Sequence, residues 1–375
     1  MAEELAGNGT ESVLQFGGGN FLRAFADVFV DRANRGPRPV GKAVVVQSTP
    51  GPRAEWINSQ AGAYHVVTRG IEAGETVDRV ERVAPLSRAL VAATQWQQVL
   101  EAGRSPALRL VVSNTTEAGL ALDGDEKPSG KEAPRSFPAK LLAVLLARRQ
   151  AGLGGLTVLP CELIEGNGDL LYRLVLEQAR GWRVEDAALD WLKNECRWPN
   201  TLVDRIVSGR PAEHPLLAED QLLTVAEPYA LWAIEAPGLD FVDDPAVRLV
   251  DDVAPYALRK VRLLNGAHTA LVCRAGGRFE TVRQAVEDSA VRGWLETLLY
   301  QELLPPVSGR VDGAEAFAGQ VLERLANPFL DHRLADIALH HETKVGTRLL
   351  PTYREFKETQ GSEPALLAEI LKPYL

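Results

Sequence analysis

Three polar residues suited to proton transfer lie within nine positions of one another: Lys260, Asn265 and His268. If this run is helical, their side chains fall at about 0°, 140° and 80° around the axis, on one side of the helix. A lysine of lowered pKa acts as a general acid or base, and amide and imidazole N–H groups can bind a carbonyl or alkoxide oxygen. The cluster therefore predicts proton transfer at an alcohol or ketone. The alternative is an amphipathic helix whose Lys260 and His268 face water and whose Asn265 caps a turn.

The composition narrows the class of protein that carries this cluster. The chain has 375 residues, 46% of them hydrophobic and 24% charged, which is typical of a globular protein of two or three domains. A net charge of −9 argues against a nucleic-acid partner, and no apolar run is long enough to span a membrane. The N-terminus lacks the pattern of a signal peptide, so we expect a cytoplasmic location. The three cysteines are widely spaced and no metal-binding spacing is present, so we predict neither a disulfide framework nor a metal site.

The N-terminal half alternates strand and helix patterns. Short β-branched runs at 43–47, 108–114 and 156–160 predict buried strands, and a helix is expected over 138–150. Residues 64–68 and 77–83 alternate like a half-exposed hairpin. This order predicts a Rossmann-type α/β domain with a mostly parallel sheet covered on both faces.

A glycine turn follows the first expected strand. Residues 13–16 form a short apolar run, Gly17-Gly18-Gly19 follows, and Asn20 is expected to cap a helix that ends near Asn34. Glycines at this place let the backbone approach the pyrophosphate of a dinucleotide at the N-terminus of the helix. Leu22 stands where the third glycine of the usual fingerprint would be, so the motif is incomplete. A glycine-rich turn without a ligand is the alternative.

Five blocks together carry a family resemblance: residues 16–25, 113–119, 160–164, 200–206 and 260–268. With these blocks the chain resembles the polyol-specific long-chain dehydrogenase/reductase family, which includes mannitol dehydrogenases, mannitol-1-phosphate dehydrogenases and the tagaturonate and fructuronate reductases. The resemblance implies an N-terminal dinucleotide-binding domain, a mostly helical C-terminal domain and metal-independent hydride transfer with a nicotinamide cofactor.

The resemblance also implies roles for individual residues. Lys260 matches the general acid/base, and Asn265 and His268 match the groups that bind the reacting oxygen. The other matching positions form three sets: the pyrophosphate loop at Gly17, Gly19, Asn20, Phe21 and Arg23; the segment under the nicotinamide at Asn114, Thr115, Thr116 and Glu117; and the substrate-side pair Asp204 and Arg205. A plain ion pair is the alternative for the last set.

Departures from the mannitol branch bear on the substrate. Leu163 replaces an asparagine of the oxyanion site, Ala257 replaces a glutamate three residues before the catalytic lysine, and Asp336 stands where an arginine is expected. Asn167 is the nearest local substitute for the missing amide, although it can equally cap a helix. The remaining blocks look most like tagaturonate reductases, which interconvert a keto-hexuronate and a hexonate. A sugar-phosphate or mannitol dehydrogenase, and a non-catalytic dinucleotide-binding protein, are the alternatives.

A sugar-acid substrate requires cations for its carboxylate. Arg205, Lys344 and Arg348 are the candidates, and the last two are four residues apart, so they can share one helix face. A phosphate could occupy the same cations, and solvated basic residues at this spacing are common.

The cofactor prediction depends on the end of the second strand, where an NAD enzyme often has an acidic residue. Here the strand ends at Gln47, whose amide can bond a ribose hydroxyl, and Arg53 could meet the 2′-phosphate of NADP. The alternative for Arg53, which the neighbouring Pro50, Gly51 and Pro52 favour, is a surface-loop residue without a ligand. The resemblance favours NAD, and NADP is not excluded.

The domain prediction divides the chain into 1–208, which binds the dinucleotide, and 209–375, in which helices are expected and strand patterns are weak. We expect a small-molecule partner, a sugar acid or polyol, and a monomer or small homo-oligomer.

Overall fold

The computed structural model describes residues 9–124 and 130–375, and these divide into two compact units. Unit 1 comprises the chain up to Val67, Val80–Ala226 and Ala230–Val253. Unit 2 comprises Thr68–Arg79, Glu227–Tyr229 and Ala254–Leu375. Across the described residues, no helix combines the length and hydropathy needed to cross a bilayer.

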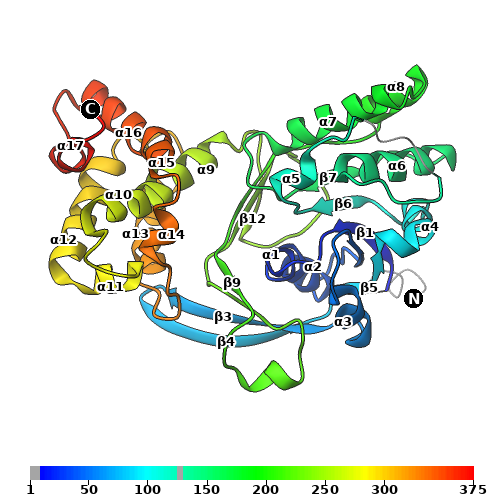
Figure 1. Cartoon of the computed structure of the whole chain (residues 1–375), viewed down its shortest axis with the longest axis horizontal. Coiled ribbons are helices and arrows are strands. Elements are labelled where there is room, and N and C mark those ends of the chain that lie inside the picture. Colours follow the sequence, from blue (N-terminus) through cyan, green and yellow to red (C-terminus); the bar gives the residue numbers. More distant parts are fainter. Residues whose placement is uncertain (1–8, 125–129) are drawn as a thin grey trace. The chain divides into compact units, whose positions relative to one another are not determined.

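A five-stranded parallel sheet forms the centre of unit 1 (Figure 1). Its order is β5 (Leu86–Val91), β2 (Lys42–Gln47), β1 (Glu11–Phe16), β6 (Leu110–Ser113) and β7 (Thr157–Pro160). Each neighbouring pair is parallel, and Leu14 of β1 lies opposite Val44 of β2 and Val111 of β6. The predicted parallel α/β fold is confirmed.

Alternate side chains of the strands enter two separate cores, one on each face of the sheet. Val13, Val45 and Val112 pack with α2 (Ala26–Asn34) and α3 (Arg53–Ser59). The residues next to them in sequence pack on the other face with α4 (Ala92–Gly103), α6 (Phe137–Gln150) and α7 (Asn167–Gly181). Successive side chains of a strand point to opposite faces of the sheet, so neighbouring residues enter different cores.

The helix after the glycine turn is interrupted, which differs from the prediction. α1 (Asn20–Arg23) is a single turn, and α2 begins after Phe25, whose φ and ψ of −135° and −91° are not helical. Asn20 does not cap the helix: Gly19 occupies the N-cap position, and the Asn20 side-chain oxygen accepts a hydrogen bond from Arg23 at 2.7 Å. The amide that was expected to cap α1 is therefore bound by a guanidinium.

Short strands continue beyond the predicted domain boundary. The predicted hairpin is present as β3 (Tyr64–Glu72) and β4 (Glu75–Val83), in one sheet with β10 (Thr224–Ala226) and β9 (Val207–Gly209). A three-stranded sheet joins β8 (Thr201–Asp204), β11 (Leu231–Ile234) and β12 (Val247–Leu249).

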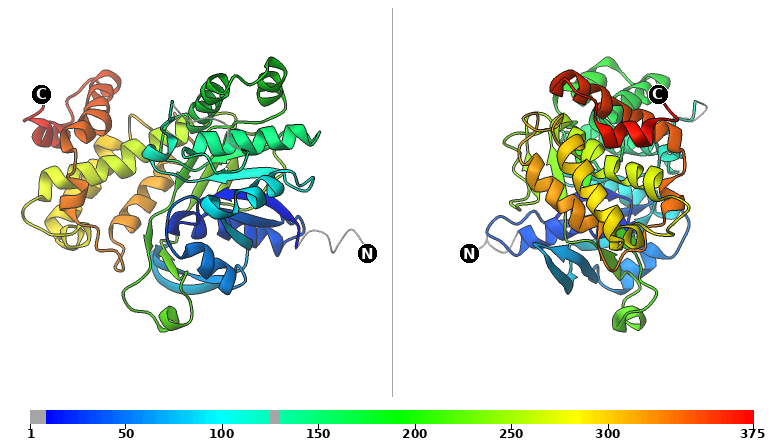
Figure 2. Two further views of the ribbon diagram at one scale, coloured as in Figure 1. Left: turned by 45° about the vertical axis from the view of Figure 1, so that its right-hand side comes forward. Right: turned by 90° about the vertical axis from the view of Figure 1, so that its left-hand side faces the viewer.

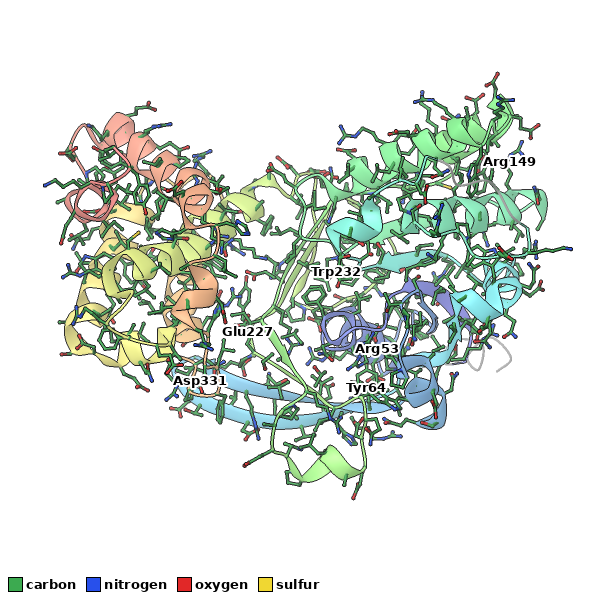
Figure 3. All side chains as sticks on the ribbon, viewed as in Figure 1. Arg53, Tyr64, Arg149, Glu227, Trp232 and Asp331 are labelled. Carbon is green, nitrogen blue, oxygen red and sulfur yellow. The ribbon has the colours of Figure 1, made fainter. Side chains whose placement is uncertain are left out.

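The division between the units differs from the expected boundary after Ser208, since the main break follows Val253. The physical reason is packing: β11 and β12 pair beside β8, and Trp232 and Val247 enter the core of unit 1. Trp232, labelled in Figure 3, is fully buried against Phe25, Phe29 and Phe241.

Unit 2 is mainly helical, as predicted (Figure 2). Its helices pack around one core that includes Leu271, Leu298 and Phe317. The longer ones are α10 (Gly266–Ala275), α12 (Ser289–Leu298), α13 (Ala314–Leu325), α15 (His341–Arg348) and α16 (Leu350–Gln360).

A buried ion pair crosses unit 2 between segments far apart in sequence. Glu227, labelled in Figure 3, accepts two hydrogen bonds from Arg324 of α13, at 2.9 and 2.7 Å. Both side chains are at most 3% exposed. The guanidinium also lies 4.3 Å from the centre of the Tyr229 ring. Glu227–Tyr229 therefore belongs with the helices rather than with the neighbouring strands β10 and β11.

Candidate active site

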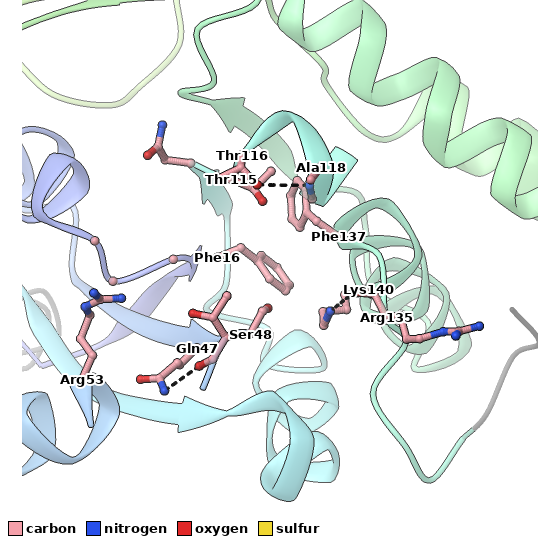
Figure 4. Close-up of a pocket in the computed structure, with 16 residues that line it drawn as sticks. Phe16, Gln47, Ser48, Arg53, Thr115, Thr116, Ala118, Arg135, Phe137 and Lys140 are labelled. Atoms are coloured by element: carbon pink, nitrogen blue, oxygen red, sulfur yellow. Dashed lines mark hydrogen bonds between the residues drawn. The ribbon is translucent and has the colours of Figure 1, made fainter. Parts of the chain in front are cut away.

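A pocket of about 420 Å³ lies at the carboxyl ends of the parallel strands of unit 1 (Figure 4). Its described lining residues are Phe16, Gly17, Gly18, Gly19, Gln47, Ser48, Thr49, Arg53, Asn114, Thr115, Thr116, Ala118, Gly119, Arg135, Phe137 and Lys140. Doubly wound folds bind ligands outside the carboxyl ends of their parallel strands, at the point where the strand order reverses. In this sheet that point lies between β1 and β6, next to β2. The pocket therefore has the position of a dinucleotide site.

The glycine turn fits close approach of a ligand backbone. Gly17 has φ +110°, where a side chain is strained, and a Cβ there would lie 3.1 Å from the carbonyl oxygen of Asn114. A Cβ at Gly18 would lie 3.1 to 3.4 Å from atoms of Arg53, Val45 and Ile57, whereas a Cβ at Gly19 would meet nothing within 4 Å. The turn is thus tightly packed on the protein side and open at Gly19, as a cradle for a phosphate group requires.

The segment after β6 is hydrogen-bonded to the residues that follow β7. Glu162 is buried and accepts hydrogen bonds from the Thr115 backbone N–H at 2.9 Å and the Ser113 hydroxyl at 3.2 Å. Burial raises the pKa of its carboxyl group. The Asn114 amide donates to the Cys161 carbonyl at 2.7 Å. Glu162 therefore positions the segment that was predicted to pass under the nicotinamide.

The predicted cofactor residues divide into two groups. Gly17, Gly19, Asn114, Thr115 and Thr116 line the pocket. The described lining does not include Asn20, Phe21 or Arg23, and the Glu117 side chain lies outside the described part of the structure.

Gln47 lines the pocket but is 5% exposed and bonded within its own turn. Its amide donates to the carbonyls of Thr49 and Gly51 at 2.9 and 2.7 Å, and its oxygen accepts from the Ala54 N–H at 2.7 Å. Both N–H groups and the oxygen of the Gln47 amide are used to close the turn. No amide atom is therefore left for the predicted hydrogen bond to a ribose hydroxyl.

Arg23 and Arg205 are buried among backbone carbonyls. Arg23 donates to the carbonyls of Gly18 and Leu222, and burial lowers the pKa of its guanidinium. Arg205 donates to the Ala24 carbonyl at 2.7 Å and is 8% exposed, and Asp204 beside it is 3% exposed. Both arginines thus hold the backbone around α1, and a substrate role for Asp204 and Arg205 stays a prediction.

The predicted proton-transfer cluster of unit 2 lies on a continuous helical run with an unexpected segment. α9 (Ala254–Arg259) leads into the π-helical η2 (Lys260–Asn265), and α10 follows at Gly266. A π-helix bonds residue i to residue i+5, so Lys260 and Asn265 stand about one turn apart on the same side. Both side chains are half-buried. The Asn265 amide makes no capping bond and has no hydrogen-bond partner among the described residues, which leaves it available to a substrate oxygen.

His268 is buried, which does not fit the solvated-helix alternative. Its Nδ1 lies 3.0 Å from the Leu264 carbonyl, and since a carbonyl oxygen only accepts, Nδ1 carries the proton. Burial lowers the pKa of His268 from 6.5 to about 3, with further lowering by His332, whose ring centre is 5.2 Å away, and by Arg324 and Arg348. The imidazole is therefore neutral near pH 7 and presents Nε2 as an acceptor. This differs from the predicted N–H donor.

Two cations lie next to this turn. Arg348 donates to the Thr269 hydroxyl at 3.2 Å, and that hydroxyl donates to the Asn265 carbonyl at 2.9 Å. Lys344, one turn earlier on α15, donates to the Ile337 carbonyl at 2.8 Å, and its pKa is lowered by burial and by Arg348. No Asp or Glu of the described residues forms an ion pair with either side chain. Half-buried, unneutralised cations of this kind suit an anionic group.

Asn167 does not replace the amide missing at Leu163. Its NH₂ group lies within hydrogen-bond distance of the carbonyls of Pro160, Glu162 and Thr201, and its oxygen accepts from the Thr201 N–H at 2.8 Å. The side chain is 3% exposed, so it joins β7 to β8, whereas Leu163 is 78% exposed. Asn265 is thus the one predicted site residue with an uncommitted amide in the described structure.

Most of the chain matches two domains of one known protein family. Residues 11–243 match the mannitol dehydrogenase Rossmann domain, and residues 252–372 match the mannitol dehydrogenase C-terminal domain. The chain belongs to the mannitol dehydrogenase family. It is a dehydrogenase/reductase that acts on a sugar derivative with a nicotinamide cofactor, so the resemblance seen in the sequence is confirmed.

Curated relatives in this family are named altronate oxidoreductase. The chain is 40% identical to that of Halalkalibacterium halodurans over 378 residues, which is 95% of this chain and 73% of the relative. It is 37% identical to that of Bacillus subtilis over 376 residues, covering 95% and 77%.

Solved structures of the family share the fold. A substrate-free D-sorbitol dehydrogenase superposes with a TM-score of 0.81 at 24% identity, covering 98% of this chain and 81% of its own. The Pseudomonas fluorescens mannitol 2-dehydrogenase in a ternary complex with NAD and D-mannitol gives 0.75 at 22%, covering 97% and 78%.

Several functional positions of this family member were not singled out from the sequence. Glu162 lies within a family block, but only its contacts with the 113–115 segment reveal its positioning role. Ser48, Thr49 and Lys140 line the pocket although no motif marks them. The position of Ser48 and Thr49 directly after a buried strand was the available signal.

Proposed function

We propose that the chain is an NAD-dependent altronate oxidoreductase that interconverts altronate and tagaturonate in the cytoplasm. The observation that carries the substrate is the pair Lys344 and Arg348, whose charges no described carboxylate neutralises, next to the Asn265–His268 turn. Planar guanidinium groups bind carboxylates through paired hydrogen bonds. The relatives named altronate oxidoreductase support the same choice.

The residues divide the chemistry as follows. Lys260 delivers a proton to the ketone oxygen during reduction and removes it during oxidation. The free Asn265 amide donates to the same oxygen as charge develops on it. His268, neutral and protonated at Nδ1, accepts a hydrogen bond from a substrate hydroxyl at Nε2, while Arg348 and Lys344 bind the carboxylate.

The glycine turn and the segment 114–116 would hold the cofactor. A bound nicotinamide supplies or accepts the hydride. Gly17 and Gly19 would hold the cofactor's phosphates, and the segment bound by Glu162 would hold its nicotinamide end.

A substrate panel tests the proposal. Tagaturonate, fructuronate, fructose and fructose 6-phosphate are each supplied with NADH, and NADH consumption is followed. We expect tagaturonate to have the highest kcat/KM. Faster reduction of fructose 6-phosphate would assign the cations to a phosphate, and no turnover of any keto sugar by protein that binds NADH would refute the enzyme proposal.

Arg348→Met separates carboxylate binding from general damage. Loss of a charge-assisted hydrogen bond should raise KM for tagaturonate by about 10- to 100-fold. The matched control is Arg354→Met, because Arg354 on α16 is exposed and makes no hydrogen bond or ion pair in the described structure. Equal losses for the two variants would refute the subsite.

A further inference from the structure

The turn that follows β2 is closed by its own first residue. Gln47 binds the carbonyls of Thr49 and Gly51 and the N–H of Ala54, and its side chain is buried. The turn therefore has one defined shape, in which Ser48 and Thr49 are exposed at the pocket and Arg53 begins α3 (Figure 4).

The described lining of the pocket as a whole has three cationic residues, Arg53, Arg135 and Lys140, and none of its sixteen residues is an aspartate or glutamate. Arg135 is paired with Asp123, so Arg53 is the cation next to the turn after β2. A dinucleotide site that selects against a 2′-phosphate usually places an acidic residue at the end of the second strand, where it binds the ribose hydroxyls and repels phosphate. Here that position holds Gln47, which is neutral and committed to the turn.

Arg53 is placed to meet an additional phosphate. Its Cδ lies 3.1 Å from where a Cβ of Gly18 would be, so its stem runs along the middle of the glycine turn. The side chain is half-buried, and its guanidinium has no hydrogen-bond or ion-pair partner in the described structure. Nearby, Arg23 is a like charge that adds to the positive potential.

We propose that the pocket also binds NADP(H), with Ser48, Thr49 and Arg53 forming a subsite for the 2′-phosphate of the adenosine ribose. The two hydroxyls donate to phosphate oxygens and the guanidinium binds them as a planar fork. The proposal rests on the proposed nicotinamide-dependent function and deepens it: the enzyme uses both dinucleotides, and the described lining of the pocket has no carboxylate with which to reject the phosphorylated one.

Arg53 could instead bind the pyrophosphate, since its stem follows the glycine turn. The two assignments differ in a measurable way. An arginine on the pyrophosphate contributes equally to NAD⁺ and NADP⁺, whereas an arginine on the 2′-phosphate contributes only to NADP⁺.

The experiment is calorimetric titration of the full chain with NAD⁺ and with NADP⁺ at one salt concentration. We expect wild-type protein to bind NADP⁺ no more than about tenfold more weakly than NAD⁺. Arg53→Ala and Arg53→Gln should each raise the ratio of the NADP⁺ to the NAD⁺ dissociation constant by at least about tenfold, the effect of one charge-assisted hydrogen bond.

Arg197→Ala is the matched control, because Arg197 is exposed, lies in unit 1 and does not line the pocket. It should leave the ratio as in wild-type protein. A wild-type preference for NAD⁺ above tenfold overturns the proposal, and so does an equal loss of both affinities in the Arg53 variants. If NAD⁺ binds and NADH supports tagaturonate reduction while NADP⁺ fails, only this inference falls and the proposed function stands.

Discussion

Replacement of His268 by glutamine should reduce the acid sensitivity of folding. The pKa of His268 is about 3 in the folded chain, because of burial, and 6.5 is its ordinary value. Below pH 6.5 the His268 ring is therefore protonated in the unfolded chain, whereas in the folded chain it stays neutral until the pH approaches 3. Stability is complete above pH 6.5 and falls by about 1.4 kcal/mol per pH unit as the pH drops toward 3.

At pH 5 this linkage costs the wild-type protein about 2 kcal/mol relative to pH 8, since the difference from 6.5 is about 1.5 units. His268→Gln removes the titrating ring and should remove that part of the pH dependence. His332, Arg324 and Arg348 face the ring and remain in both proteins, so their own contributions largely cancel.

Urea unfolding at pH 8 and pH 5 measures the difference, and hydrogen exchange of peptides from α10 shows whether the effect is in unit 2. The matched control is His214→Gln, since His214 lies in unit 1 and its ring accepts a hydrogen bond from the Leu216 N–H at 3.2 Å. The reasoning is refuted if His268→Gln loses as much stability between pH 8 and pH 5 as the wild-type protein does.

Three further variants test other parts of the structure. Lys260→Ala should lower turnover by about two to four powers of ten while calorimetric NAD⁺ affinity changes little, and near-normal activity across pH would remove its acid/base role. Glu227→Gln leaves the buried Arg324 charge without its ionic partner and should lower the free energy of unfolding by about 3–5 kcal/mol, whereas Glu72→Gln in the exposed pair with Arg79 should cost under about 1 kcal/mol; similar losses in urea titrations would contradict the role of burial. Asn167→Leu should cost about 2–4 kcal/mol because it leaves the buried Thr201 N–H without its acceptor and removes a donor to the Pro160 and Glu162 carbonyls, yet turnover per folded molecule should survive; a large fall in kcat would restore Asn167 to the oxyanion site.

Much of the fold was predictable because buried parallel strands leave a strong pattern. The run at β2 has three consecutive valines and that at β6 is Leu-Val-Val followed by Ser, and both were predicted within a few residues. β5 was missed because Ser87 and Arg88 interrupt its apolar pattern, and both bond to Glu11 instead of packing in the core. Strands β10 to β12 have three or four residues each, too few for alternation to stand out.

The candidate site was predictable in residue type but not in bonding. The spacing of Lys260, Asn265 and His268 indicated a shared helix side, and the family blocks indicated the glycine turn. No local pattern shows that the Gln47 amide closes its own turn, or that the Leu264 carbonyl accepts a hydrogen bond from Nδ1 of His268. Those hydrogen bonds depend on which backbone groups the folded chain places within about 3 Å of each side chain. Local secondary-structure propensity carries no information about such contacts.

In the π-helical segment η2, the number of residues before Gly266 determines how the side chains that follow are oriented relative to Lys260. A π turn holds one residue more than the α-helix around it. If the same six residues instead formed a regular α-helix, the extra residue would rotate all that follows by about 100° relative to Lys260. His268 and the contact between Thr269 and Arg348 would turn with it. The π turn accommodates the extra residue and so keeps His268 in phase with Lys260.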